Sequence, residues 1–131
     1  YNQLPRKLKK NTATASWAYA SAAWRSANAD DSLRVHVVVG LAGTPVDVRV
    51  GVSYRDGLSI GIGADRTNGN DADRTPQMSG TLAAGQTSEL LDLPAAGYHY
   101  YQWVEYAVSG TGTVPAATNQ IRSGIGGWVW G

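Results

Sequence analysis

Few side chains in this 131-residue chain could carry out catalytic chemistry. Cysteine is absent, so a nucleophile would be a serine or threonine hydroxyl with His36 or His99 as its base. Neither a GxSxG nor an HExxH sequence is present. His99 and Glu105 would lie about 20 Å apart along one strand, too far to pair. A carboxylate pair for glycoside cleavage would need Asp65, Asp92 or Glu105 to meet through folding. We therefore predict that the protein is not an enzyme.

The polar loop Asp65–Pro76 contains carboxylates and amides, which are the oxygen ligands that calcium prefers. The spacing of an EF-hand is not met, and Arg66 and Arg74 offset the negative charge of the loop. Asp and Asn are also common in ordinary turns, which is the interpretation that we favour. We expect no metal ion and no other cofactor.

The aromatic residues fit ligand binding better than the titratable ones fit catalysis. The chain has five tryptophans, seven tyrosines and no phenylalanine. Indole and phenol rings offer a flat apolar face to a sugar ring, and loop Asp, Asn and Arg side chains can supply hydrogen bonds. For any single tryptophan, burial in the core or in an oligomer interface is the commoner outcome. The candidate glycan-binding residues are Trp24, Trp128, Trp130, Asp65 and Arg66.

The stretch Gly97–Ser109 is the element that organises the rest of the chain. Its density of aromatic and β-branched residues predicts one long strand. Neither face of this strand is plainly polar, so one face must pack into the core. The other face must meet a second subunit, a ligand or an overlying loop. The residues that we expect at an oligomer interface are Tyr101, Trp103, Glu105 and His99.

Glu105 would need a partner wherever it is buried, because an unpaired buried carboxylate is strongly destabilising. We expect that partner to be an arginine such as Arg25 or Arg49.

Alternating apolar residues predict further strands over 12–21, 33–40, 46–54, 58–64, 77–83, 87–93 and 121–131. In the strand 58–64, Gly61 and Gly63 would point outward, which suggests that another backbone or a large ring packs closely on them. Turn sequences separate the strands, and no stretch longer than a turn or two is typical of a helix. The predicted fold is all-β, a jelly-roll-like antiparallel β-sandwich of about eight strands.

Charge divides the chain into two parts. Arg6, Lys7, Lys9 and Lys10 stand together, which leaves seven basic and ten acidic residues, or a charge of about −3, in the remainder. We predict a basic N-terminal arm or linker over 1–11 and a single β-sandwich domain over 12–131. The basic residues lie apart from the aromatic ones, which does not favour nucleic acid as a partner. No apolar run approaches the roughly 20 residues that cross a bilayer, so we expect no membrane insertion. A first residue of tyrosine suggests a processed product or a fragment.

Four stretches occur in the order SWAYASAAWRSAN, SIGIGAD, GYHYYQWVEY and NQIRSGIGGWVWG. Together they resemble a recurrent C-terminal domain of tailed-bacteriophage fibre and other virion surface proteins, over residues 11–131. The Gly-x-His-x-x-x-Trp-x-Glu pattern of that group is matched by Gly97, His99, Trp103 and Glu105. Its later Gln-Ser-Gly sequence and terminal glycine are approximated by Gln120, Ser123, Gly124 and Gly131. Here Ile121-Arg122 interrupts the Gln-Ser-Gly sequence.

The resemblance implies a β-sandwich, usually a homotrimer, that is displayed on the virion surface of tail or capsid and brings no catalytic residues. Two functions stay open. In the first, the chain is a tail-fibre-like receptor-binding domain that attaches to host cell-surface polysaccharide, with avidity from three copies. In the second, it is a structural capsid fibre, decoration or tail-assembly module with no ligand of its own. Its partners would then be copies of itself and other virion structural proteins.

Overall fold

The structure, a computed structural model, describes residues 4–52, 55–75, 81–82, 86–108, 110–115 and 123–131. Within these residues the chain forms antiparallel strands and one 3-10 turn, η1 (Ala27–Ala29), with no α-helix. The prediction of an all-β protein is therefore confirmed. None of the described residues belongs to a helix long and apolar enough to cross a membrane.

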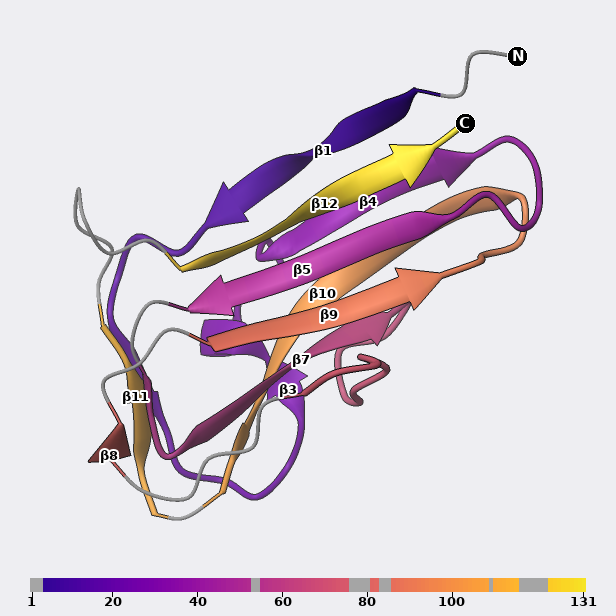
Figure 1. Cartoon of the computed structure of the whole chain (residues 1–131). Coiled ribbons are helices and arrows are strands. Elements are labelled where there is room, and N and C mark those ends of the chain that lie inside the picture. The colour runs from indigo at the N-terminus through magenta and orange to yellow at the C-terminus, as the bar shows by residue number, and fades with distance from the viewer. Residues whose placement is uncertain (1–3, 53–54, 76–80, 83–85, 109, 116–122) are drawn as a thin grey trace.

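The front sheet has four antiparallel strands (Figure 1). Their order is β1 (Pro5–Thr12), β12 (Gly124–Trp130), β5 (Val46–Val52) and β9 (Gln86–Asp92). In β5 the valines at positions 46, 48 and 50 are fully buried, whereas Asp47 and Arg49 between them face outward. The period-two alternation of the sequence thus fixes which face of this sheet packs inward.

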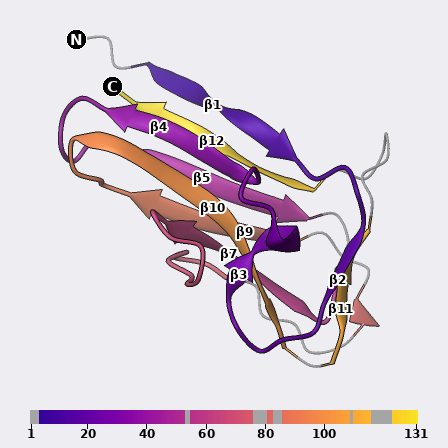
Figure 2. The same ribbon diagram turned by 180° about the vertical axis from the view of Figure 1, so that it is seen from behind.

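The back sheet is built on the long strand β10 (Gly97–Ala107) (Figure 2). Along one edge β10 pairs with β4 (Arg34–Val39) and then with β3 (Arg25–Ser26), and along the other with β7 (Leu58–Ala64). A small end sheet lies at one end of the molecule. Its strands are β2 (Trp17–Tyr19), β11 (Gly112–Val114), β6 (Arg55–Asp56) and β8 (Thr81–Leu82).

The core lies between the front and back sheets. The valines of β5 meet Ile60 and Ile62 of β7 and Trp103 of β10, all of them fully buried. The edges of the two sheets also come together, because β1 contacts β4 and β7 contacts β9. The inward faces of both sheets are therefore covered by the chain itself.

The inward aromatic face of β10 belongs to this core, so the prediction that it forms an oligomer interface is wrong. Tyr101, Trp103 and Glu105 are each at most 1% exposed. Trp103 packs edge-on against Trp17, with ring centroids 5.4 Å apart. His99, nearer the start of the strand, is partly exposed. The front sheet supplies enough apolar surface to bury these rings without a second copy of the chain.

The buried Glu105 carboxylate receives three hydrogen bonds. Arg25 Nε donates to Oε1 at 2.8 Å, the indole N–H of Trp17 donates to Oε2 at 2.7 Å, and the backbone N–H of Asn28 donates to Oε1 at 3.1 Å. The predicted pairing with Arg25 is confirmed. Three donors offset the loss of hydration that burial imposes on a carboxylate.

The opposite face of β10 is covered by other segments of the same chain. Gln102 and Val104 are fully buried there. The Gln102 amide donates to the Leu33 carbonyl at 3.0 Å, and its oxygen accepts from Arg34 Nε at 2.8 Å. A second subunit, a ligand or an overlying loop is the predicted cover for this face. Over the middle of the face, the structure shows loops of the chain itself.

The outward glycines of β7 lie under the loop that follows this strand. A Cβ atom at Gly61 would overlap the Asn70 side chain, and one at Gly63 would overlap the Arg66 carbonyl oxygen. Of the two predicted neighbours, another backbone or a large ring, a backbone lies close to Gly63, whereas the neighbour of Gly61 is the Asn70 side chain.

The basic N-terminal segment is a strand, so the prediction of a loose arm or linker over 1–11 is wrong for its described part. Residues 5–12 form β1, which pairs with β12 as the edge of the front sheet. Leu8 is 7% exposed and joins the core, whereas Arg6, Lys7 and Lys9 are exposed. Backbone pairing and the burial of Leu8 hold the segment in place. Lysines on an edge strand also discourage pairing with another chain.

Candidate functional site

The outer face of the front sheet carries three rows of residues that cross the strands. Strand registers align Lys7, Trp128, Asp47 and Leu91 in the first row, then Gly126, Arg49 and Glu89, then Gly124, Gly51 and Thr87. Residues two positions apart on a strand share a face, so the rows lie side by side. Glycines at three of these positions therefore leave part of this face, over β12 and the end of β5, without side chains.

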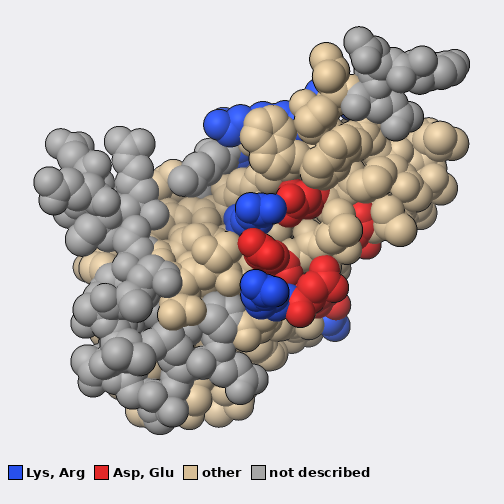
Figure 3. All heavy atoms as spheres, in the orientation of Figure 1, with Lys and Arg blue, Asp and Glu red and all other residues tan. Residues whose placement is uncertain are grey.

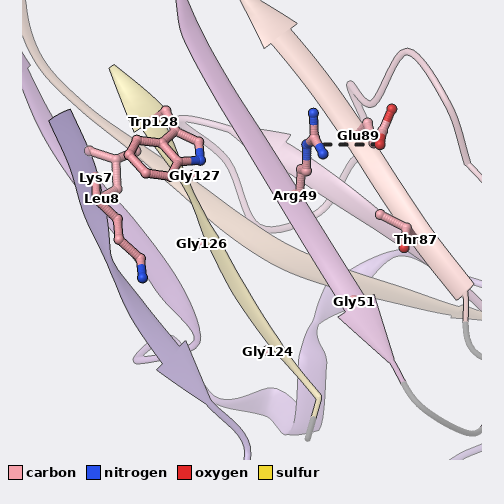
Figure 4. Close-up of a pocket in the computed structure, with 10 residues that line it drawn as sticks. All are labelled: Lys7, Leu8, Arg49, Gly51, Thr87, Glu89, Gly124, Gly126, Gly127 and Trp128. Carbon is pink, nitrogen blue, oxygen red and sulfur yellow. Dashed lines mark ion pairs between the residues drawn. The ribbon is translucent and has the colours of Figure 1, made fainter. Parts of the chain in front are cut away.

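A groove of about 400 Å³ lies where these side chains are missing (Figure 4). Gly51, Gly124 and Gly126 form its floor. Lys7, Leu8 and Trp128 stand on one side of this floor, and Arg49, Glu89 and Thr87 stand on the other. Neighbouring strands are about 4.8 Å apart, so the walls on β1 and β5 are about 10 Å apart. The volume falls in the range of small-ligand pockets, about 300–1,000 Å³.

Trp128 gives the groove an aromatic wall. Its side chain is 42% exposed, whereas the next residue, Val129, is 5% exposed and lies in the core. The alternation of β12 thus places the indole on the outer face, beside backbone that carries no side chains. An exposed indole beside bare backbone is a surface on which a sugar ring can stack.

The opposite wall is an ordered set of charged groups. Arg49 pairs with Asp47 at 3.1 Å and with Glu89 at 3.8 Å. The hydrogen bond from Arg49 to Asp47 and the negative charges of Asp47 and Glu89 raise the pKa of Arg49. Figure 3 shows basic and acidic side chains gathered over the middle of this face. This wall offers hydrogen-bond donors and acceptors in fixed positions.

Trp128 is the predicted glycan-binding residue that lines the groove. Trp130 lies on the same strand and is half-buried, outside the groove lining. Trp24 belongs to the outer face of the back sheet, where it packs against Tyr106 with ring centroids 5.4 Å apart. A separate small hollow opens there beside Ser59. The structure therefore does not bring the three predicted tryptophans into one site.

The predicted site residues Asp65 and His99 form a polar clamp where the chain leaves β7. Asp65 Oδ2 lies 2.7 Å from His99 Nδ1, and Asp65 Oδ1 accepts from the backbone N–H of Tyr100 at 2.9 Å. His99 Nε2 lies 2.9 Å from the Ala95 carbonyl oxygen. Both ring nitrogens face acceptors, so both hydrogen bonds form only with a protonated ring. The hydrogen bond with Asp65 is the main cause that raises the pKa of His99, and the charge of Asp92 adds to it.

The predicted site residue Arg66 serves the loop itself, where it pairs with Asp71. Asp71 also accepts from the backbone N–H of Ala64 at 2.9 Å, and Asn70 Oδ1 accepts from that of Ile62 at 3.0 Å. These contacts hold the loop on β7 and use the side-chain oxygens of Asn70 and Asp71, two of the loop's candidate calcium ligands. In the described part of the chain, no three His, Asp or Glu residues are grouped so as to hold a metal ion.

Sequence reasoning missed most of the groove. Lys7 falls in the predicted arm, and Glu89, Thr87 and Gly51 fall in predicted strands with no role of their own. Arg49 is predicted only as a possible partner of Glu105. A signal was present, because Gly51 alternates with inward valines just as Gly61 and Gly63 alternate with inward isoleucines. What the sequence did not contain was the order of the strands, which places β12 between β1 and β5.

Comparisons with known proteins give no relative of this chain. No protein-family model, no curated protein and no solved structure matches it.

Proposed function

We propose that this chain is a receptor-binding domain of a bacteriophage virion, tail-fibre-like in its role, that binds host cell-surface glycan in the groove of the front sheet. One observation carries the proposal: an exposed indole, Trp128, borders a groove whose floor includes Gly51, where a Cβ atom would meet no other atom within 4 Å. A sugar ring would stack on the indole, and its hydroxyl groups would hydrogen-bond to Arg49, Glu89 and Thr87. The sequence resemblance to virion surface domains supports the biological setting.

We further propose that the two packed sheets form a β-sandwich of the jelly-roll kind, and that three copies assemble on the virion surface. Single-site glycan binding is weak, and three linked grooves would raise the avidity without new contacts. The assembly surface would lie away from the groove and from the buried face of β10.

Binding without cleavage is the chemistry that we assign to the groove. The two carboxylates nearest to its wall, Asp47 and Glu89, both pair with Arg49. Glycoside hydrolysis needs one carboxyl group as acid and another as base or nucleophile across the scissile bond. Two carboxylates held by one guanidinium on the same wall do not provide that arrangement.

The proposal is tested by measuring the binding of the purified chain to a glycan array and to whole host cells. Trp128→Ala should weaken glycan binding by about tenfold or more, because the stacking surface is lost. Gly51→Leu should have a similar effect by filling the groove from its floor, where a Cβ atom meets no other atom within 4 Å. Trp24→Ala removes a tryptophan outside the groove and should leave binding unchanged. Equal losses in all three variants, or no binding by the unchanged chain, would refute the proposal.

A structural virion module is the second candidate, because one end of the molecule exposes apolar side chains. Val38 and Tyr98 are cross-strand partners at 71% and 59% exposure. Leu41 and Leu93 are 72% and 63% exposed in adjoining loops, which a hydrogen bond from Gly43 to Pro94 connects. Such a surface suits contact with another copy or another virion protein. Light scattering of Val38→Glu and of the unchanged chain measures the molar mass of each and so tests this. A variant that is monomeric but still binds glycan would show that assembly uses this apolar surface and not the groove.

A further inference from the structure

We propose that the groove selects an acidic glycan, one whose ring stacks on Trp128 and whose carboxylate or phosphate is bound by Lys7. This inference rests on the proposed glycan-binding function and specifies the class of ligand. It follows from how charge is distributed between the two walls of the groove.

Lys7 is placed at the groove by the register of β1. It is the cross-strand partner of Trp128, so its side chain leaves the sheet beside the indole. Figure 4 shows the Lys7 side chain on the β1 side of the glycine floor. Among the described residues, no carboxylate lies within ion-pair distance of Lys7. An ammonium group with no acidic partner beside an aromatic platform is suited to bind an anionic substituent of a stacked ring.

The opposite wall has the reverse character and so sets the orientation of the ligand. There the charge of Arg49 is shared between Asp47 and Glu89. An anionic group on that side would meet two carboxylates, whereas sugar hydroxyl groups can donate hydrogen bonds to Glu89. The walls on β1 and β5 are about 10 Å apart, so one sugar ring can present an anionic substituent to Lys7 and hydroxyl groups to the side chains of β5, with β9 one strand further.

The rest of β1 reinforces this polarity. Arg6 and Lys9 are exposed on the same strand, and β1 contains no acidic residue. Together with Lys7 they make this edge of the sheet attractive to anions over a distance of about one Debye length, about 8 Å at physiological salt. Lys9 does not line the groove. It is therefore the matched control for the electrostatic attraction of anions to β1 as a whole.

The test measures affinity for four probes at physiological salt. These are oligogalacturonate, its carboxyl-reduced form, a phosphorylated mannan and its dephosphorylated form. The unchanged chain should bind at least one acidic probe about tenfold more tightly than its neutral counterpart. Lys7→Gln should remove that preference by weakening the binding of the acidic probe far more than that of its neutral counterpart, since the ammonium group pairs only with an anion. Lys9→Gln should change acidic binding by less than about twofold.

The outcomes distinguish the two proposals. A preference for carboxylate over phosphate, or the reverse, identifies the source of the anion, and both support the inference. Equal binding of acidic and neutral probes, or equal losses in Lys7→Gln and Lys9→Gln, overturns the inference while glycan binding itself stands. Absence of binding to all four probes and to the glycan array overturns both. Trp128→Ala serves in each series as the variant that abolishes stacking whatever the charge of the probe.

Discussion

Glycines on the outward faces of strands meet opposite surroundings in the two sheets. On β7 of the back sheet, a Cβ atom at Gly61 or Gly63 would overlap the loop that lies on the strand. On β5 of the front sheet, a Cβ atom at Gly51 would meet no atom within 4 Å. The first pair of glycines makes room for the loop, through the Asn70 side chain at Gly61 and through backbone at Gly63. The open space at Gly51 instead leaves a groove beside the exposed Trp128.

This difference shows why outward glycines alone do not identify a binding site. A glycine on a strand indicates either that a neighbour approaches closely or that the surface there is open. The sequence pattern is the same in both cases. At Gly63 the neighbours are the carbonyl oxygens of Arg66 and Gly69. At Gly51 a Cβ atom would enter the groove, which Gly124 and Gly126 of the adjacent strand also line. Only the open surface has room for a ligand.

The largest effect should come from Gly63→Ala. The added Cβ atom would overlap the Arg66 carbonyl and come within 2.9 Å of the Gly69 carbonyl, and backbone atoms cannot rotate away. We expect the free energy of unfolding to fall by about 3 kcal/mol, as for an overpacked core position. Urea denaturation measures it. A loss below about 0.5 kcal/mol would mean that the loop does not rest on β7, and the contrast between the two sheets would fail.

An intermediate effect should come from the clamp that closes the start of the same loop. His99 donates to Asp65 and to the Ala95 carbonyl, and Asp92, which accepts from the Tyr101 hydroxyl at 2.7 Å, is the other nearby anion. The pKa of His99 is raised in the folded chain above its ordinary 6.5. Its contribution to stability is therefore complete below about pH 6.5 and is lost as the pH rises through the raised pKa.

We expect the unchanged chain to exceed His99→Gln in stability by about 1 kcal/mol near pH 5.5, and by less near pH 9. Urea denaturation of both proteins across this range measures the difference. His36→Gln is the control, because the His36 ring stacks on Tyr98 at the surface, away from the clamp. A stability difference that grows with pH would show that His99 acts as a neutral ring.

The smallest effect should come from Gly51→Ala. Its Cβ atom enters open space, and alanine loses less backbone entropy on folding than glycine, so we expect a gain of between zero and about 1 kcal/mol in the free energy of unfolding. Thermal unfolding beside Gly63→Ala gives a direct comparison of the same substitution on the two sheets. A clear destabilisation at Gly51 would show that the groove floor is structurally constrained, and the open surface would lose its meaning as a ligand site.

The amino-acid sequence by itself determined the all-β character, the principal strands and the inward faces of most of them. Period-two alternation in 46–52 and 58–64 is enough for this, since a residue's face depends only on its neighbours along the strand. The pairing of Glu105 with Arg25 was also accessible, because a buried carboxylate requires a cation.

Tertiary structure alone decided what covers each face. The sequence predicts an oligomer interface at the aromatic face of β10, but the front sheet of the same chain buries Trp103 completely. The charge pattern predicts an arm over the basic segment, but β12 pairs with this segment and brings Lys7 beside Trp128. Both errors have one physical cause: the fold joins residues that are far apart in the sequence, and local pattern contains no information about such contacts. The groove exists because β12 lies between β1 and β5, which no stretch of the sequence specifies on its own.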